Sequence, residues 1–334
     1  MRKALVIGID DYETMPLNGC VNDATKIASL LETHGDGSPN FAVRRITSND
    51  DEDEVTTAAL THSLEELFSG EADTALFYFA GHGIIDPLAN QGFLVTVDGH
   101  KPNWGLSLST ILTMANRAHP RIKSSIIILD SCHSGFAGEL QGLAQGGEIS
   151  AIGNGVTILT ACDRAGTAAE DPANCHGTFT SLLLDALNGA AADIRGRISP
   201  ASIYSHIDQT LGVWDQRPIY KANVRTFMSL RDVPPKVSLD VLRRLPIYFP
   251  NANDVFALDP SFEPDRGEFA QELTHIPVNE DNVRIYKELQ QCSYNSLVRP
   301  LDQPHMWHAA VHATGCRLTA TGAHYRKLAE MGRI

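Results

Sequence analysis

The fold is decided by two stretches, residues 74–83 (TALFYFAGHG) and residues 125–135 (SIIILDSCHSG). Each begins as a continuous apolar run and then breaks into a glycine-containing turn with polar side chains. Continuous apolar runs are typical of parallel strands that are covered on both faces. In an open parallel sheet, catalytic and ligand-binding groups gather beyond the carboxyl ends of the strands. We therefore expect both turns to lie at one edge of the same sheet.

The side chains that follow these strands include His82 and Cys132, which adjacent strands would bring together. A thiol becomes a strong nucleophile when it is deprotonated, and a nearby imidazole can favour the thiolate and later protonate a leaving amine. The amides of Gly83 and Cys132 could form an oxyanion hole, because glycines beside His82 let a substrate carbonyl approach the backbone. A lone buried cysteine or histidine is more often structural, so the evidence for catalysis is the pair.

The first two thirds of the chain alternate strand-like and helix-like segments, which predicts an α/β fold with a mostly parallel central sheet flanked by helices. Further strands are expected at residues 3–9, 42–46, 93–97 and 156–160. Helices are expected at residues 21–31, 55–68, 109–118, 179–187 and 200–211, the first of them with apolar residues at spacings of three and four.

A domain boundary is expected at Pro234-Pro235, since neither proline can donate to a ladder and each restricts the residue before it. Residues 1–232 would form the larger domain, and residues 233–334 a smaller α or α+β module. Residues 236–280 contain five more prolines and no long periodic run, which predicts an irregular arm. Helices are expected again from residue 282, at 306–313 and at 319–331.

The composition of the 334 residues, 43% hydrophobic and 20% charged, is that of a globular protein and excludes a disordered or collagenous chain. No apolar run approaches the roughly 18 to 20 residues that span a bilayer. The opening segment is too short and too acidic for a signal peptide, so we expect a cytoplasmic protein. The six cysteines form no CxxC pair, and neither a disulfide framework nor a zinc ribbon is expected.

Charge is distributed unevenly along the chain. Residues 1–232 hold 16 basic and 28 acidic residues, which argues against nucleic-acid binding by this part. Residues 284–334 hold 7 basic and 3 acidic residues, a net charge of +4 that would suit nucleic acid or an acidic partner.

The sequence resembles the caspase-like cysteine peptidases, the clan of caspases, metacaspases and their bacterial relatives. The resemblance covers about residues 1 to 230 and rests on six segments in the family's order: GIDDY at 8–12, LNGCVNDA at 17–24, YFAGHG at 78–83, LDSCHSG at 129–135, TACDRAGTAAE at 160–170 and HGTFT at 176–180. It implies that Cys132 is the nucleophile, that His82 is the general base and acid, and that the amides of Gly83 and Cys132 form the oxyanion hole. It also implies a large-subunit-like region at about 1–140 and a small-subunit-like region at about 152–232.

The resemblance to metacaspases in particular assigns Cys20, Asp23 and Asp130 to an acidic substrate-binding pocket. Paired carboxylates favour Arg, through bidentate contact, and then Lys as a point charge, so we expect cleavage of protein substrates after these residues. The alternatives are that Asp23 is an ordinary first-turn helix acid and that Asp130 stabilises a turn. Metacaspases often have Ser before the GHG, where this chain has Ala80, and this difference loosens the pocket without reversing its charge.

No metal or other cofactor is predicted. Many metacaspases need calcium and carry clustered acids after the histidine loop, but residues 84–99 offer only Asp86 and Asp98. The acidic run at residues 49–54 is typical of a solvated loop before a helix. The spacing of the three histidines and one cysteine near the C-terminus permits a metal site on a helix, although a polar helix face explains them more simply: His305, His308, His312 and Cys316.

The leading hypothesis is a cytosolic cysteine endopeptidase of bacterial style, without a recruitment segment before its catalytic domain, in a regulated stress, cell-death or defence pathway. An activating protein or ligand would act through residues 233–334. One alternative is a catalytically silent caspase-like scaffold. Another is a regulator that binds nucleic acid or protein through the C-terminal module, of which residues 282–334 look weakly winged-helix-like.

The loop between the two subunit-like regions contains no Lys or Arg from His133 to Asp163. An enzyme specific for basic residues would have no site of its own there, so we expect activity as a single chain without intersubunit self-cleavage. The next basic residues are Arg164, and then Arg195 and Arg197, which a mobile loop could expose.

Overall fold

The computed structural model describes residues 1–48, 54–86, 91–131, 152–161, 170–171, 176–212 and 217–334, with only the backbone for 170, 171 and 176. Cys132, Arg164 and the loop at residues 135–151 therefore lie outside the described residues. The contacts divide the chain into two compact units, Met1–Pro234 and Pro235–Ile334, and each unit is described by itself.

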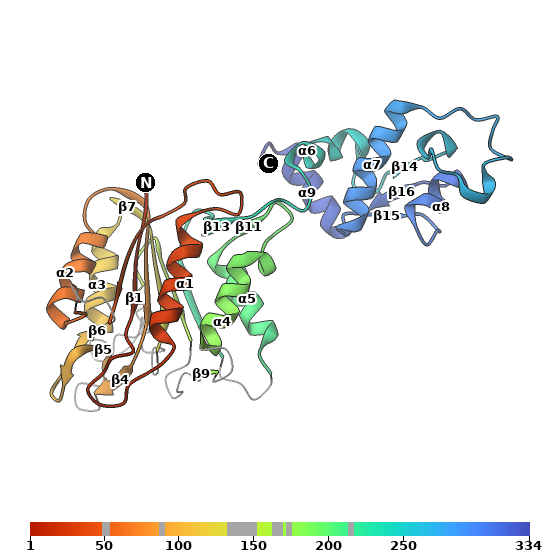
Figure 1. The fold of residues 1–334 in the computed structure, drawn as a ribbon. Coiled ribbons are helices and arrows are strands. Elements are labelled where there is room, and N and C mark those ends of the chain that lie inside the picture. Colours follow the sequence, from red (N-terminus) through yellow and green to blue (C-terminus); the bar gives the residue numbers. More distant parts are fainter. Residues whose placement is uncertain (49–53, 87–90, 132–151, 162–169, 172–175, 213–216) are drawn as a thin grey trace. The chain divides into compact units, whose positions relative to one another are not determined.

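The first unit is built on a six-stranded sheet with the order β12-β8-β7-β3-β1-β2 (Figure 1). Its strands are β1 (Arg2–Gly8), β2 (Ala42–Thr47), β3 (Ala72–Ala80), β7 (Ile122–Asp130), β8 (Val156–Thr160) and β12 (Ile219–Asn223). All neighbouring pairs are parallel except β12 with β8. The predicted α/β fold with a mostly parallel central sheet is confirmed.

Helices cover both faces of this sheet (Figure 1). One face packs against α1 (Cys20–Glu32), α4 (Thr178–Asp185), η2 (Ala186–Ala190) and α5 (Pro200–Thr210), and the other against α2 (Thr57–Leu67) and α3 (Leu108–Ala118). Within β1, Leu5 and Ile7 enter the core beneath α2 and α3, whereas Ala4 and Val6 enter the core beneath α1 and α4. Both faces of the inner strands are thus buried, which explains why β1, β3, β7 and β8 are continuous apolar runs in the sequence.

Smaller ladders flank the central sheet. The strand expected at 93–97 belongs to an antiparallel sheet of β4 (Gly83–Asp86), β5 (Gln91–His100) and β6 (Asn103–Ser107). β9 (Glu170–Asp171) pairs with β10 (His176–Gly177), directly before α4. β11 (Arg197–Ile198) pairs with β13 (Arg231–Asp232).

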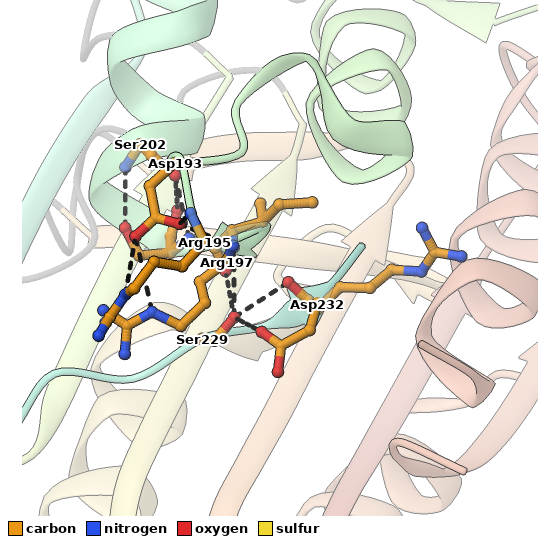
Figure 2. A network of polar contacts seen from close by, with 9 residues as sticks. Asp193, Arg195, Arg197, Ser202, Ser229 and Asp232 are labelled. Atoms are coloured by element: carbon orange, nitrogen blue, oxygen red, sulfur yellow. Dashed lines mark hydrogen bonds and ion pairs between the residues drawn. The ribbon is translucent and has the colours of Figure 1, made fainter. Parts of the chain in front are cut away.

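The turn before β11 is tightly bonded (Figure 2). The Asp193 carboxylate accepts hydrogen bonds from the backbone N–H groups of Arg195 and Arg197, at 2.8 and 2.9 Å. The Val233 N–H donates to the Gly196 carbonyl at 2.8 Å. The Arg195 side chain is only 11% exposed. The sequence left open that a mobile loop could expose this segment; in the structure, one carboxylate and the β11–β13 ladder hold its backbone.

The second unit is an α+β structure. Its helices are α6 (Leu239–Tyr248), η3 (Pro260–Phe262), η4 (Gly267–Phe269), α7 (Glu280–Tyr294), α8 (Met306–Val311) and α9 (Ala320–Glu330). A three-stranded antiparallel sheet has the order β14-β16-β15, formed by β14 (Val255–Phe256), β15 (Val298–Pro300) and β16 (Cys316–Leu318). Within the described ranges, no helix is long and apolar enough to cross a bilayer.

The expectation of an irregular arm over residues 236–280 was wrong at α6. This helix forms because Val241, Leu242 and Leu245 bury one face and the Ser238 hydroxyl accepts a hydrogen bond from the Val241 N–H. Pro246 lies in its last turn, where it has no N–H to donate to the Leu242 carbonyl. Because of this proline the sequence predicted irregular structure, whereas tertiary packing stabilises a helix here.

Candidate active site

The two strands singled out in the sequence are direct neighbours that end in register. β3 and β7 are parallel, Ala80 pairs with Asp130, and the Gly81 N–H donates to the Asp130 carbonyl at 3.3 Å. His82 and Cys132 each follow this last pair by two residues. The structure describes His82, whereas Cys132 lies just past Ser131, the last described residue of its segment.

The His82 ring is oriented by a backbone carbonyl. Its Nε2 lies 2.6 Å from the carbonyl oxygen of Met15, which adopts a left-handed conformation with φ 62°. A carbonyl only accepts hydrogen bonds, so Nε2 carries the proton. In the neutral ring, Nδ1 is then the unprotonated nitrogen and the one that can accept a proton.

The His82 backbone is held by Tyr12. The Tyr12 hydroxyl accepts a hydrogen bond from the His82 N–H at 3.0 Å and donates one to the Val95 carbonyl at 3.2 Å. Its ring centroid lies 4.6 Å from that of His82. Burial raises the pKa of Tyr12 well above the ordinary value, so the hydroxyl stays protonated. A Cβ at Gly81 would lie 2.5 Å from this hydroxyl, which explains the glycine before His82.

The loop that supplies Tyr12 and Met15 is closed by Asp10. The Asp10 carboxylate accepts hydrogen bonds from the N–H groups of Cys20 and Val21, at 2.8 and 3.3 Å, where α1 begins. These N–H groups have no partner inside the helix, and a carboxylate there also interacts favourably with the helix dipole. Asp10 and Tyr12 belong to the GIDDY segment, and no role was predicted for either of them. Asp10 lies ten residues before the start of α1, so its position in the sequence gave no capping signal.

The backbone N–H of Gly83 points away from the neighbouring strand. Val95 donates to the His82 carbonyl at 2.9 Å, so the next pair, Gly83 with Leu94, is a non-hydrogen-bonded pair of the antiparallel ladder. β4 is an edge strand of its sheet in the part of the chain that the structure describes. The Gly83 N–H therefore faces the side of β4 that does not pair with β5.

The structure brings Asp23 and Asp130 together at the start of α4. Asp23, in the first turn of α1, accepts a hydrogen bond from the Gly177 N–H at 3.1 Å. Asp130, the last residue of β7, accepts one from the Thr180 hydroxyl at 2.7 Å. A Cβ at Gly177 would lie 2.7 Å from an Asp130 carboxylate oxygen and 3.4 Å from one of Asp23. Both acids are buried, and each accepts a hydrogen bond from the segment at the start of α4.

Cys20 is the first residue of α1 and is half-buried. It lies near Tyr12 and near Tyr78, a residue of β3. Burial raises the pKa of Tyr12 and of Tyr78, and in each case Cys20 adds to the rise. The three residues assigned to the pocket thus come from two elements, α1 and β7.

Within the described ranges, no three His, Cys, Asp or Glu side chains are grouped so that they could hold a metal ion. The C-terminal histidines do not extend along one helix, because His305 and His312 flank α8 at its two ends. The rings of His308 and His312 are 6.1 Å apart, and Cys316 is buried in β16.

Comparisons with known proteins agree with this architecture. The family model of the caspase domain, Peptidase_C14, matches residues 1–228. The crystal structure of protein GSU0716 from Geobacter sulfurreducens is similar with a TM-score of 0.51 and 16% identity, over 70% of this chain and 97% of that one. Caspase-1 from Spodoptera frugiperda gives a TM-score of 0.49 and 11% identity, over 69% and 90%. A search of curated proteins found no match. The chain belongs to the caspase-domain family of cysteine peptidases.

Proposed function

We propose that this protein is a cysteine endopeptidase that uses Cys132 and His82 to cleave proteins after Arg and, less efficiently, after Lys. The observation that carries the proposal is the in-register end of β3 and β7, because His82 and Cys132 follow the same ladder pair at the same distance in sequence. Family membership adds that the domain is of a cysteine-peptidase type.

The chemistry follows from the groups around His82. Nδ1 accepts the proton of the Cys132 thiol, and the thiolate attacks the scissile carbonyl. The N–H groups of Gly83 and Cys132 stabilise the oxyanion. The imidazolium then gives its proton to the leaving amine, and water, activated by the neutral ring, hydrolyses the thioester. The Met15 carbonyl keeps Nε2 as the proton-bearing nitrogen throughout.

The specificity rests on the two buried carboxylates. Asp23 and Asp130 have lost most of their hydration, and like charges so close together favour a cation between or beside them. A guanidinium offers five donors in a planar fork that matches carboxylates, whereas an ammonium offers a single point charge. Arg is therefore the preferred residue before the cleaved bond, and Lys the second choice.

The proposal extends to the biological setting. The substrate is a protein, the enzyme acts in the cytoplasm in a regulated stress, cell-death or defence pathway, and an activating protein or ligand binds residues 233–334. The acidic catalytic unit is not proposed to bind nucleic acid, and no metal is included.

Fluorogenic peptides with Arg, Lys, Asp or Leu before the cleaved bond test the proposal, with Cys132→Ala as the control. We expect turnover of the Arg and Lys peptides only, in that order, and labelling of Cys132 by an arginyl chloromethylketone. A preference for Asp would overturn the specificity. A folded wild-type protein that neither turns over peptides nor reacts with the chloromethylketone would favour the silent scaffold.

A further inference from the structure

Two buried side chains lie beside Asp130 of the proposed pocket and have no part in the mechanism above. Thr180 lies in α4 and Tyr78 in β3, and both are fully buried. The Thr180 hydroxyl lies 2.7 Å from the Asp130 carboxylate, and the Tyr78 hydroxyl lies 2.6 Å from that of Thr180. The three side chains form one hydrogen-bonded chain that joins β3, α4 and β7.

The direction of this chain follows from the number of protons. Thr180 has a single hydroxyl proton, and it donates this proton to Asp130. The contact between Tyr78 and Thr180 must then have Tyr78 as the donor. Burial, with the negative charges of Asp130 and Asp23 adding to it, raises the pKa of Tyr78 well above its ordinary value. Tyr78 therefore remains a donor, and both hydrogen bonds point toward Asp130.

The second carboxylate is held by the same helix start. The Gly177 N–H, at the N-cap of α4, donates to Asp23 at 3.1 Å. One short segment, residues 177–180, thus fixes one oxygen of each acid, while the acids themselves come from α1 and β7. Bidentate recognition of a guanidinium needs carboxylates in a fixed orientation, whereas a single ammonium tolerates a turned carboxylate.

We propose that Thr180, oriented by Tyr78, is a positioning residue that fixes the Asp130 carboxylate and thereby sets the preference for Arg over Lys. This inference rests on the proposed function. Thr180 touches no reacting atom, and its effect reaches the substrate only through Asp130. The hydroxyl is the active feature, so serine should replace threonine, and valine, which has the same shape, should not.

The test compares Thr180→Val, Thr180→Ser and Tyr78→Phe in the full-length protein, with Thr178→Val as the matched control. Thr178 precedes Thr180 by about half a helical turn, and Thr178 is exposed. The measurements are kcat and KM for the Arg and Lys peptides, the rate of Cys132 alkylation by iodoacetamide, and the melting temperature. Iodoacetamide carries no basic group and so reports on the nucleophile alone.

For Thr180→Val we expect kcat/KM with the Arg peptide to fall about 10- to 100-fold, the range for losing a hydrogen bond to a charged group. The loss should lie mainly in KM, the Lys peptide should lose less, and alkylation should be unchanged. Tyr78→Phe should have a smaller effect in the same direction. Thr180→Ser and Thr178→Val should behave like the wild type.

Unchanged Arg and Lys kinetics in folded Thr180→Val would overturn the inference. Equal losses with Arg, Lys and iodoacetamide would also overturn it, because they would show that Thr180 only supports the end of β7. If Thr180→Val does not fold, an unchanged Arg-to-Lys ratio in Tyr78→Phe decides against the inference. Wild-type enzyme that prefers neither basic residue would instead refute the proposed function on which it depends.

Discussion

The two halves of the candidate site are built in opposite ways. His82 lies on the loop after β3 and is half-buried. Its backbone N–H donates to the Tyr12 hydroxyl, and its ring contacts the Met15 carbonyl. Asp23 and Asp130 are buried, and helix α4 fixes them with hydrogen bonds from Gly177 and Thr180.

This difference matches what the proposed function requires of each half. A general base must exchange protons with the substrate and with water, so it needs an accessible ring whose tautomer is fixed. A pocket that discriminates cations needs carboxylates in a dry, rigid environment, where charge interactions are strong and geometry is enforced. Substitutions on the His82 side should therefore change kcat, and substitutions on the acidic side should change selectivity and KM.

The largest effect is expected at the reacting groups. Cys132→Ala and His82→Ala should each lower kcat/KM at least about 10³-fold, because the nucleophile and its base act as a unit. For the same reason the double variant should be no slower than either single one. Peptide turnover and circular dichroism provide the measurements. Substantial turnover by folded Cys132→Ala would remove Cys132 from the mechanism.

A smaller effect is expected in the pocket. Asp23→Ala should weaken transition-state binding of an Arg peptide by about 2 to 4 kcal/mol, the range for removing one partner of a buried charge pair. Asp130→Ala should act alike. Steady-state kinetics with the Arg peptide measures the change, and the rate of Cys132 alkylation by iodoacetamide should stay unchanged. Equal losses with the Arg peptide and with iodoacetamide would contradict the division between the two halves.

A further effect is expected on the His82 side of the site, in the variant Tyr12→Phe. Removal of the hydroxyl leaves the His82 N–H without its acceptor, and we expect kcat to fall about 10-fold with little change in KM. The pH dependence of Cys132 alkylation should shift, since the ring loses its fixed position. Tyr204→Phe, on α5, is the matched control. A change confined to KM would show that Tyr12 belongs functionally to the pocket.

The smallest change is expected in covalent structure. Active enzyme should keep its full mass, because residues 133–163 contain no basic residue. Arg195 and Arg197 are not expected to be cleaved either, since the Asp193 turn and the β11–β13 ladder hold their backbone. Intact-mass spectrometry of active wild type and of Cys132→Ala tests this. Obligatory cleavage between Gly135 and Gly155, present only in the wild type, would contradict either the specificity or the single-chain activation.

The parts of the fold that the sequence predicted are those with the strongest local signal. β1, β3, β7 and β8 are continuous apolar runs, and their buried positions left little ambiguity. β12 was not predicted, because the edge strand IYKAN is half-buried or exposed at each position and is specified by its pairing with β8. α6 was hidden by its proline.

The residues of the candidate site also differ in whether they carry a local signal in the sequence. His82, Asp23 and Asp130 could be named from motifs, because each is a chemically distinctive residue at a strand end or helix start. Tyr12, Thr180 and the Met15 carbonyl could not, since their roles depend on contacts between residues 50 to 102 positions apart. A backbone carbonyl carries no signal in the side-chain sequence at all.

The last ladder pair of β3 and β7, Ala80 with Asp130, limits where insertions and deletions in the gene can be tolerated. Backbone hydrogen bonds set where both turns begin, so loops beyond His82 and Cys132 can lengthen or shorten without moving either residue. Inside the strands the opposite holds. One inserted residue would shift a turn by about 3.3 Å and reverse the face on which every later side chain of that strand lies. Length variation among related genes should therefore be found in the loops and be excluded from residues 72–82 and 122–132.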